Sequence, residues 1–259
     1  ATLAGQVAPH ESTAAKTIYG HDAAGRRITV TDAMGGVTTT QLNGLGKAVK
    51  VTDPRNAVGF FYYDGAGRLT LQVDPEKHWT RTTYWAGEEV ASVTRGVSRV
   101  TGTLTVNTPP TTPTHIDDAT TSFERDKAGR ITKVTDAEGY YEAYTLNAFG
   151  ERTVVRNKLG FNTTYAYDLR GLMVSETLPI TSLQGSTEVA VVNQYEYDAF
   201  GDMKRSIEAA GLVEQRITNF QYDKLGRLTV KSGEALTVTS SSNFAASTAT
   251  PTESITYNA

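Results

Sequence analysis

Residues 61–75 read Phe61-Tyr62-Tyr63-Asp64-Gly65-Ala66-Gly67-Arg68-Leu69-Thr70-Leu71-Gln72-Val73-Asp74-Pro75, and this stretch decides the fold. Aromatic residues precede Asp64, a glycine and an arginine follow it, and an alternating apolar run leads to Asp74-Pro75. Apolar residues at every second position predict half-exposed β-strands. Asp, Gly and Pro in these places predict tight turns. The stretch therefore predicts strand, turn, strand, turn.

The same unit recurs along most of the chain. Each copy has an Asp or Asn, which we call the anchor, and a Gly three places later. The steps from 22 to 43, 43 to 64, 126 to 147 and 147 to 168 are each 21 residues, and the 62-residue step from 64 to 126 suggests two worn copies between them. The anchors are Asp22, Asn43, Asp64, Asp126, Asn147, Asp168, Asp198 and Asp223, and their glycines are Gly25, Gly46, Gly67, Gly129, Gly150, Gly171, Gly201 and Gly226. A fixed period of this kind is the signature of a repeat architecture.

The chemistry of a tight turn explains the spacing. The side-chain oxygen of an Asp or Asn accepts hydrogen bonds from the backbone a few residues on, and the Gly supplies the positive φ that closes a type I turn with a bulge. Ten places after most anchors a second turn signal follows, as in Asp53-Pro54, where Pro presets φ. We expect an all-β fold of antiparallel β-hairpin repeats, in which successive units extend one sheet.

Composition narrows the function classes. The 259-residue chain has a net charge of −3 and no block of like charge, so the sequence has no electrostatic footprint for nucleic acid. It has no Cys and no apolar run long enough to span a membrane. We interpret the chain, which ends at Tyr257-Asn258-Ala259 as if opening another unit, as a piece of a longer repeat protein.

The repeat divides the chain into five segments: a lead-in over 1–18, repeats over 19–82, degenerate repeats with a Pro/Thr-rich loop over 83–122, repeats over 123–233 with an insert near 180–192, and a Ser/Thr-rich tail over 234–259 that enters a further repeat. The Pro/Thr-rich part is expected to be an exposed, extended loop, because Pro cannot donate to a sheet ladder.

Four Tyr-Asp pairs carry a family resemblance: Tyr63-Asp64, Tyr167-Asp168, Tyr197-Asp198 and Tyr222-Asp223. The fuller pattern Tyr-Asp-x-x-Gly-Arg-Leu-Thr is complete at 63–70 and 222–229, and Arg130 occupies the same place in a related copy. These residues resemble the YD repeats of the Rhs and YD-repeat family. The resemblance implies a curved, spiralling sheet that is part of a hollow shell, as in Rhs toxins, Tc toxin complexes and teneurins.

The resemblance also implies a function. It predicts a non-enzymatic structural segment, secreted or at the cell surface, whose partners are the remainder of the same repeat polypeptide and an enclosed toxin domain. The alternative is an adhesion module that binds glycans or surface proteins. No residue of this chain matches the family's self-cleavage region.

We predict no catalytic, cofactor-binding or metal site. The four His residues show no pair at metal-ligand spacing, and turn capping explains the recurrent Asp residues. The predicted site is therefore the set of repeat-defining structural residues: the anchors and glycines given above together with Tyr63, Arg68, Arg130, Tyr167, Tyr197, Tyr222 and Arg227. The tyrosines are expected to pack in cross-strand ladders. The alternative for them is an exposed aromatic stripe for carbohydrate.

Overall fold

The computed structural model describes residues 15–179, 190–239 and 246–257, and every regular element in them is a β-strand. This confirms the all-β prediction. The chain forms two compact units, one of Ala1–Ser122 with Asp136–Glu138, the other of Phe123–Thr135 with Gly139–Ala259. Residues 1–14 of the expected lead-in, 180–189 of the expected insert, and 240–245 and Asn258 of the expected tail lie outside the described residues.

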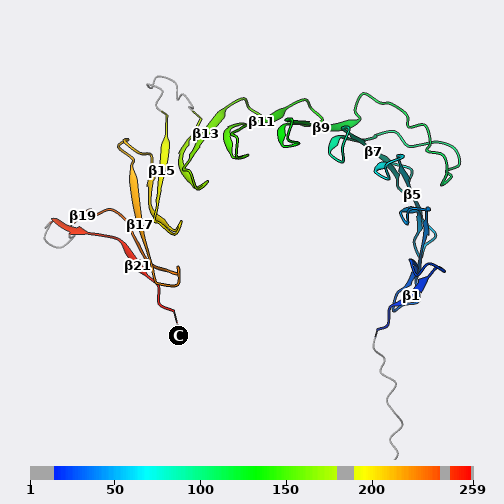
Figure 1. The fold of residues 1–259 in the computed structure, drawn as a ribbon, viewed down its shortest axis with the longest axis horizontal. Helices are drawn as coiled ribbons and strands as arrows, with labels where there is room; N and C mark the ends of the chain where they lie inside the picture. The colour runs from blue at the N-terminus through cyan, green and yellow to red at the C-terminus, as the bar shows by residue number, and fades with distance from the viewer. Residues whose placement is uncertain (1–14, 180–189, 240–245, 258–259) are drawn as a thin grey trace, which may run out of the picture. The chain divides into compact units, whose positions relative to one another are not determined.

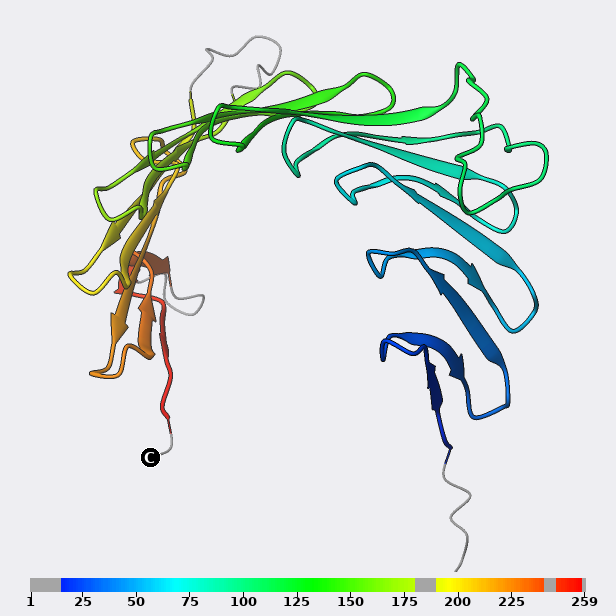
Figure 2. The same ribbon diagram turned by 45° about the vertical axis from the view of Figure 1, so that its right-hand side comes forward.

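In the first unit, consecutive strands pair antiparallel in chain order. Figure 2 shows these hairpins in blue to cyan, each beside the next. The strands are β1 (Ile18–His21), β2 (Arg27–Thr31), β3 (Val37–Leu42), β4 (Ala48–Thr52), β5 (Val58–Tyr63), β6 (Leu69–Val73), β7 (Trp79–Tyr84) and β8 (Val90–Arg95), and β8 pairs with the start of β9 (Ala119–Arg125).

The second unit repeats this arrangement, again with antiparallel neighbours in chain order up to β18 (Figure 1). After β18 the chain forms a separate two-stranded sheet, β19 with β20, before β21 returns to pair with β18. The strands are β10 (Ile131–Thr135), β11 (Tyr141–Leu146), β12 (Arg152–Arg156), β13 (Asn162–Tyr167), β14 (Met173–Thr177), β15 (Val192–Tyr197), β16 (Met203–Glu208), β17 (Arg216–Tyr222), β18 (Leu228–Ser232), β19 (Leu236–Thr239), β20 (Ala246–Ala249) and β21 (Thr252–Ser254).

Most hairpin ends at both edges of the sheet use one turn geometry. At the first edge, Gly67 donates to the Asp64 carbonyl at 3.0 Å and has a φ of 80°. At the opposite edge, Gly35 donates to the Asp32 carbonyl at 3.0 Å with a φ of 83°. Asn56 takes the same left-handed conformation after Asp53-Pro54. The turns at the opposite edge thus have the same geometry as the turns at the first edge. The sequence indicates this likeness, because a Gly also stands three places after Asp32, Asp136 and Asn157.

A segment of residues 96–118, which we call the strap, lies on one face of β5–β7. Val100 of the strap is 2% exposed and belongs to a buried cluster with Tyr62, Leu71, Val73 and Trp79. The Trp79 ring nitrogen donates to the Ser98 carbonyl at 2.9 Å, and the Tyr62 hydroxyl donates to the Thr105 carbonyl at 2.8 Å. The strap therefore supplies the second layer that the sheet lacks on this face.

The strap closes at its own ends. The Asp118 carboxylate accepts from the backbone N–H groups of Val97 and His115, both at 2.9 Å. These bonds, first the one from His115 and then the one from Val97, lower the pKa of Asp118 below its ordinary value of 3.8. The close contact of Trp79 with Gly96 explains that glycine, since a Cβ there would lie 2.0 Å from the indole ring.

The structure refines two expectations about this region. The Pro/Thr-rich stretch is a mostly exposed loop as expected, but Thr112 within it is buried and its hydroxyl accepts a hydrogen bond from Arg81. Between Asp64 and Asp126 there is one worn copy rather than two. Its anchor position is held by Trp85, whose N–H donates to the Glu89 carbonyl at 3.0 Å, and the strap replaces its second turn.

Replacing Val100 with Ala should lower the free energy of unfolding by about 2 kcal/mol, because two buried methyl groups are lost. Val97→Ala is the matched control. Val97 lies in the same strap but is 53% exposed, so its substitution should change stability by less than about 0.5 kcal/mol. Urea denaturation of both variants measures the difference, and equal effects would show that the strap does not form the core.

Candidate functional site: the joints between repeat units

All eight predicted anchors cap their turns in the same way. The Oδ1 atom of each accepts from the backbone N–H groups two and four places on, at 2.9–3.0 Å. The eight predicted glycines all have a positive φ, between 74° and 94°. We call the five residues from each anchor to the fourth following residue an anchor turn. The contact region between two successive anchor turns is called a joint.

A tyrosine hydroxyl crosses most joints. The Tyr before an anchor donates to the backbone carbonyl five places after the previous anchor, as Tyr63 does to Ala48 at 2.9 Å. This contact, which we call the tyrosine clip, also joins Tyr84 to Leu69, Tyr167 to Arg152, Tyr197 to Met173, Tyr222 to Met203 and Tyr257 to Leu228, at 2.8–3.0 Å. Burial raises the pKa of Tyr63, Tyr167, Tyr197 and Tyr222 above 10.0, so the hydroxyls stay protonated donors at neutral pH.

An arginine side chain also crosses several joints. It reaches forward to the next anchor turn, whereas the tyrosine reaches back to the previous unit. Arg130 Nε donates to the Asp126 carboxylate at 2.7 Å, and its Nη1 reaches the carbonyl of Asn147, the next anchor, at 3.1 Å. Arg26 makes the same contacts with Asp22 and Asn43. At two joints the guanidinium also stacks over the next clip tyrosine: Arg68 lies 4.8 Å from the Tyr84 ring centre, and Arg227 lies 4.5 Å from that of Tyr257.

The joint depends little on which side chain follows the glycine. That side chain lies against the glycine of the next anchor turn, as Arg130 does against Gly150 and Leu172 against Gly201. Where Leu172 replaces arginine, Arg170, two places earlier, bonds to Asp168 and to the carbonyl of Asp198 at 2.7 Å. Where Glu151 replaces it, the amide of Asn147 donates to the Glu151 carboxylate at 2.5 Å.

The Thr of the Gly-Arg-Leu-Thr pattern has a role that the sequence did not reveal. The strand register shifts beside seven of the eight anchor turns, for example between Tyr62 and Tyr63. Such a bulge disrupts the ladder locally. The Thr70 hydroxyl donates to the Tyr62 carbonyl at 3.2 Å, and Thr153 and Thr229 make the equivalent bond.

One group in the described residues could offer metal ligands: Asp74, Glu76 and His78, whose ligand atoms lie within 4.8 Å of one another. The Asp74 Oδ1 atom caps its own turn by accepting from the His78 N–H at 2.7 Å. Arg99 Nε donates to His78 Nε2 at 3.4 Å and places a positive charge beside the group. Turn capping thus accounts for Asp74. No helix that could cross a membrane occurs in the described part of the chain.

Replacing Tyr222 with Phe should lower the free energy of unfolding by about 1 kcal/mol, the typical contribution of one neutral hydrogen bond, because the clip to Met203 is lost. Tyr195→Phe is the control, since no hydrogen bond of the Tyr195 hydroxyl occurs among the described residues. Thermal unfolding of both variants tests this, and an equal loss in the control would contradict the clip.

Acid should weaken the anchor turns. The backbone N–H of the fourth following residue is the main cause that lowers the pKa of Asp22, Asp64, Asp126 and Asp223 below 3.8. A lowered folded-state pKa contributes stability that is complete above the unfolded value and is lost as pH falls through the folded one. The melting temperature should therefore fall below about pH 4.

The control for the acid effect is Asp64→Asn. The amide oxygen keeps both backbone bonds, as Asn43 does, but does not titrate. Melting temperatures of this variant and of the wild type, measured from about pH 6 to about pH 3, should converge as the acid protonates Asp64. Parallel curves would count against the assignment.

Comparison with known proteins finds a matching family model over part of the chain. The RHS Repeat family model matches residues 21–58, which span the first two anchor turns. A comparison with curated proteins gives no match. Among solved structures, TcdB2-TccC3 is similar, with 17% identity, a TM-score of 0.49 and coverage of 93% of this chain and 15% of that one. A Photorhabdus luminescens Tc holotoxin pore has 12% identity and a TM-score of 0.35, and the likeness covers 86% of this chain and 15% of that one.

The chain thus spans about 15% of the length of these solved chains. The RHS Repeat match is confined to residues 21–58. The anchor turns outside 21–58 repeat the capping bonds and positive-φ glycines of those inside it. Residues 21–58 therefore match the RHS Repeat, and the later anchor turns share the geometry of the turns within that range.

Proposed function

We propose that this chain is a non-enzymatic wall segment of a larger RHS-repeat protein, and that its sheet forms part of a secreted or cell-surface shell enclosing a toxin polypeptide. The observation that carries the proposal is the joint. The tyrosine clip and the arginine both end on backbone carbonyls, which every residue offers. Such a joint can therefore be repeated for many units whatever side chains stand at the accepting positions.

The shape of the packing supports a wall rather than a globular domain. Outside the strap, large apolar side chains such as Phe149 and Leu159 are more than three-quarters exposed. The largest fully buried side chains of the described residues are only valines, Val73 and Val100. A sheet of this kind separates two volumes, which is the property that enclosure of a polypeptide requires.

The repeat-defining residues are proposed to act through this wall alone. The anchors cap turns, the glycines close them, and the tyrosines and arginines connect neighbouring units. The proposed partners are the remainder of the same repeat polypeptide and the enclosed toxin domain. The alternative, an adhesion surface for glycans or surface proteins, stays a prediction that a glycan array would test.

The experiment uses the natural full-length gene product. We expect limited proteolysis to spare one polypeptide until denaturant is added, and intact mass before and after denaturation should identify it as a piece separate from the repeats. If every part of the product is digested at the same rate with and without denaturant, the shell proposal is wrong.

A further inference from the structure

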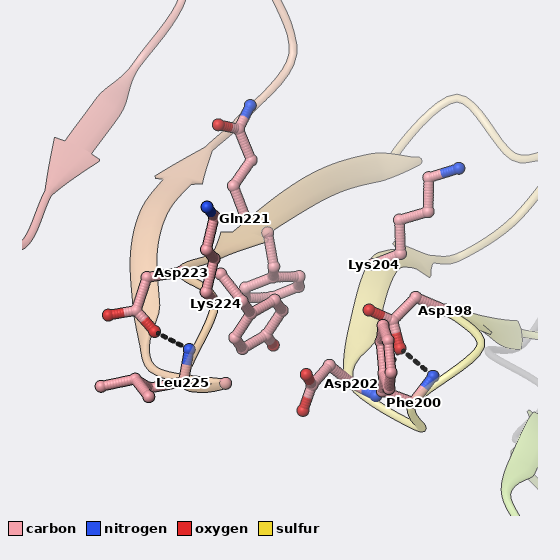
Figure 3. A pocket seen from close by; sticks show the side chains of 11 residues that line it. Asp198, Phe200, Asp202, Lys204, Gln221, Asp223, Lys224 and Leu225 are labelled. Atoms are coloured by element: carbon pink, nitrogen blue, oxygen red, sulfur yellow. Dashed lines mark hydrogen bonds between the residues drawn. The ribbon is translucent and has the colours of Figure 1, made fainter.

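One joint of the second unit is open. Between the anchor turns 198–202 and 223–227 lies a pocket of about 720 Å³, which we call the Asp202 pocket. Its walls include the rings of Phe200, Phe220 and Tyr222 and the carboxylate of Asp202. Figure 3 shows Asp202 extending from its turn toward the turn of Leu225, whereas the Lys204 ammonium points away.

Other joints show what occupies this place. At the joint after Asp126, the Arg130 guanidinium bonds to the next anchor carbonyl and lies 3.3 Å from the Cβ position of Gly150. At the joint after Asp64, Arg68 stacks on the next clip tyrosine, Tyr84. An arginine at this position is thus held by a backbone carbonyl, an aromatic face and a carboxylate.

The joint after Asp198 keeps the clip tyrosine and the carbonyl of the next anchor, and Asp198 is its anchor carboxylate, but it has no arginine. Asp202 occupies the arginine position, with its Oδ2 3.8 Å from the Cβ position of Gly226. The clip tyrosine is in place, since the Tyr222 hydroxyl donates to Met203 at 3.0 Å. The Asp223 carbonyl accepts only the turn bond from Gly226 among the described residues. The arginine that fills the preceding joint, Arg170, bonds to the Asp198 carbonyl and not here.

Carboxylate charge reaches the pocket, which Lys204 and Lys224 also line. Burial is the main cause that raises the pKa of Tyr222, and the charges of Asp202 and Asp198 raise it further. Asp223 is already neutralised by Arg227 at 2.7 Å, whereas Asp202 forms no ion pair within the described ranges. Lys204 and Lys224 line the rim but are exposed. A buried cation would therefore gain both carboxylate and aromatic contacts here.

We propose that the Asp202 pocket binds an arginine side chain carried by a polypeptide. The guanidinium would stack on Tyr222, donate to the Asp202 carboxylate and donate to the Asp223 carbonyl. Arginine fits better than lysine because its planar fork can donate to two acceptors while its face lies on an aromatic ring. A polypeptide fits better than a free cation because Phe200 and Leu225, 93% and 76% exposed, flank the pocket and offer apolar contacts to neighbouring residues.

This inference stands apart from the proposed shell, because it concerns one joint and any polypeptide that reaches it. The probe is the blocked tripeptide acetyl-Gly-Arg-Gly-amide, titrated into the full 259-residue chain. Amide chemical shifts of Asp202, Tyr222 and Gly226 report binding. We expect Asp202→Asn to weaken the affinity about tenfold, because a hydrogen bond between two charged groups is lost. Glu214→Gln, the same change in charge at an exposed site outside the pocket, should leave it unchanged.

Three further probes make the chemistry specific. The lysine tripeptide and the neutral citrulline tripeptide should bind more weakly than the arginine tripeptide. Equal binding of either one overturns the assignment to a guanidinium. Tighter binding of spermidine overturns the assignment to a polypeptide. Shifts that persist in Asp202→Asn at unchanged affinity overturn the site itself.

A second variant tests the pocket without any ligand. Asp202→Arg restores the arginine of the repeat, and its guanidinium should contact Tyr222 and the Asp223 carbonyl. We expect a higher melting temperature than that of Asp202→Asn, together with loss of tripeptide binding. A melting temperature equal to or below that of Asp202→Asn would show that the pocket cannot hold a guanidinium.

Discussion

The structure depends on one side-chain oxygen that accepts two backbone N–H groups. In each anchor turn this oxygen holds the amides two and four places on, and the glycine between them takes the left-handed conformation that other residues adopt at a cost of about 1–2 kcal/mol. Because the oxygen can come from Asp or Asn, both occur at the anchor. The turn then sets the register of the strands that leave it, bulge included. The pairing of neighbouring strands and the contacts between units depend on that register.

The joints add side-chain contacts between hairpins that the backbone ladder already pairs. A residue of one unit reaches a backbone carbonyl of its neighbour, so the neighbour's side chains can vary without breaking the contact. The chain uses this freedom: the residue after the turn glycine is Arg26, Lys47, Glu151, Leu172 or Asp202, and each lies near the next glycine. Glu151 is satisfied by Asn147 and Leu172 is compensated by Arg170. At Asp202 no other side chain among the described residues takes over the contacts of the arginine, and a pocket lies there instead.

Hydrophobic burial is concentrated in one region. A single sheet leaves each face half exposed, and the strap covers β5–β7 at the place where their faces are richest in large apolar residues, namely Tyr62, Leu71, Val73 and Trp79. The burial of an aromatic and aliphatic cluster stabilises this region more than hydrogen bonding alone would, at about 25 cal/mol for each Å² of apolar surface removed from water. Elsewhere in the described residues the ladder and the joints carry the structure.

The repeat, the all-β class, the anchors and the turn glycines follow from the sequence alone, because turn chemistry is local: Asp64 and Gly67 act on amides within four residues. Four features follow only from the tertiary structure. They are the tyrosine clip, the contacts by which Arg170 takes the role of the arginine absent at Leu172, the bulge bond of Thr70 and the packing of the strap. Each of these contacts joins atoms of different strands or units, so their pairing depends on register and on the path of the chain. The strap, residues 96–118, has no regular secondary structure, and only the face on which it lies decides that its Val100 and Leu104 cover a core.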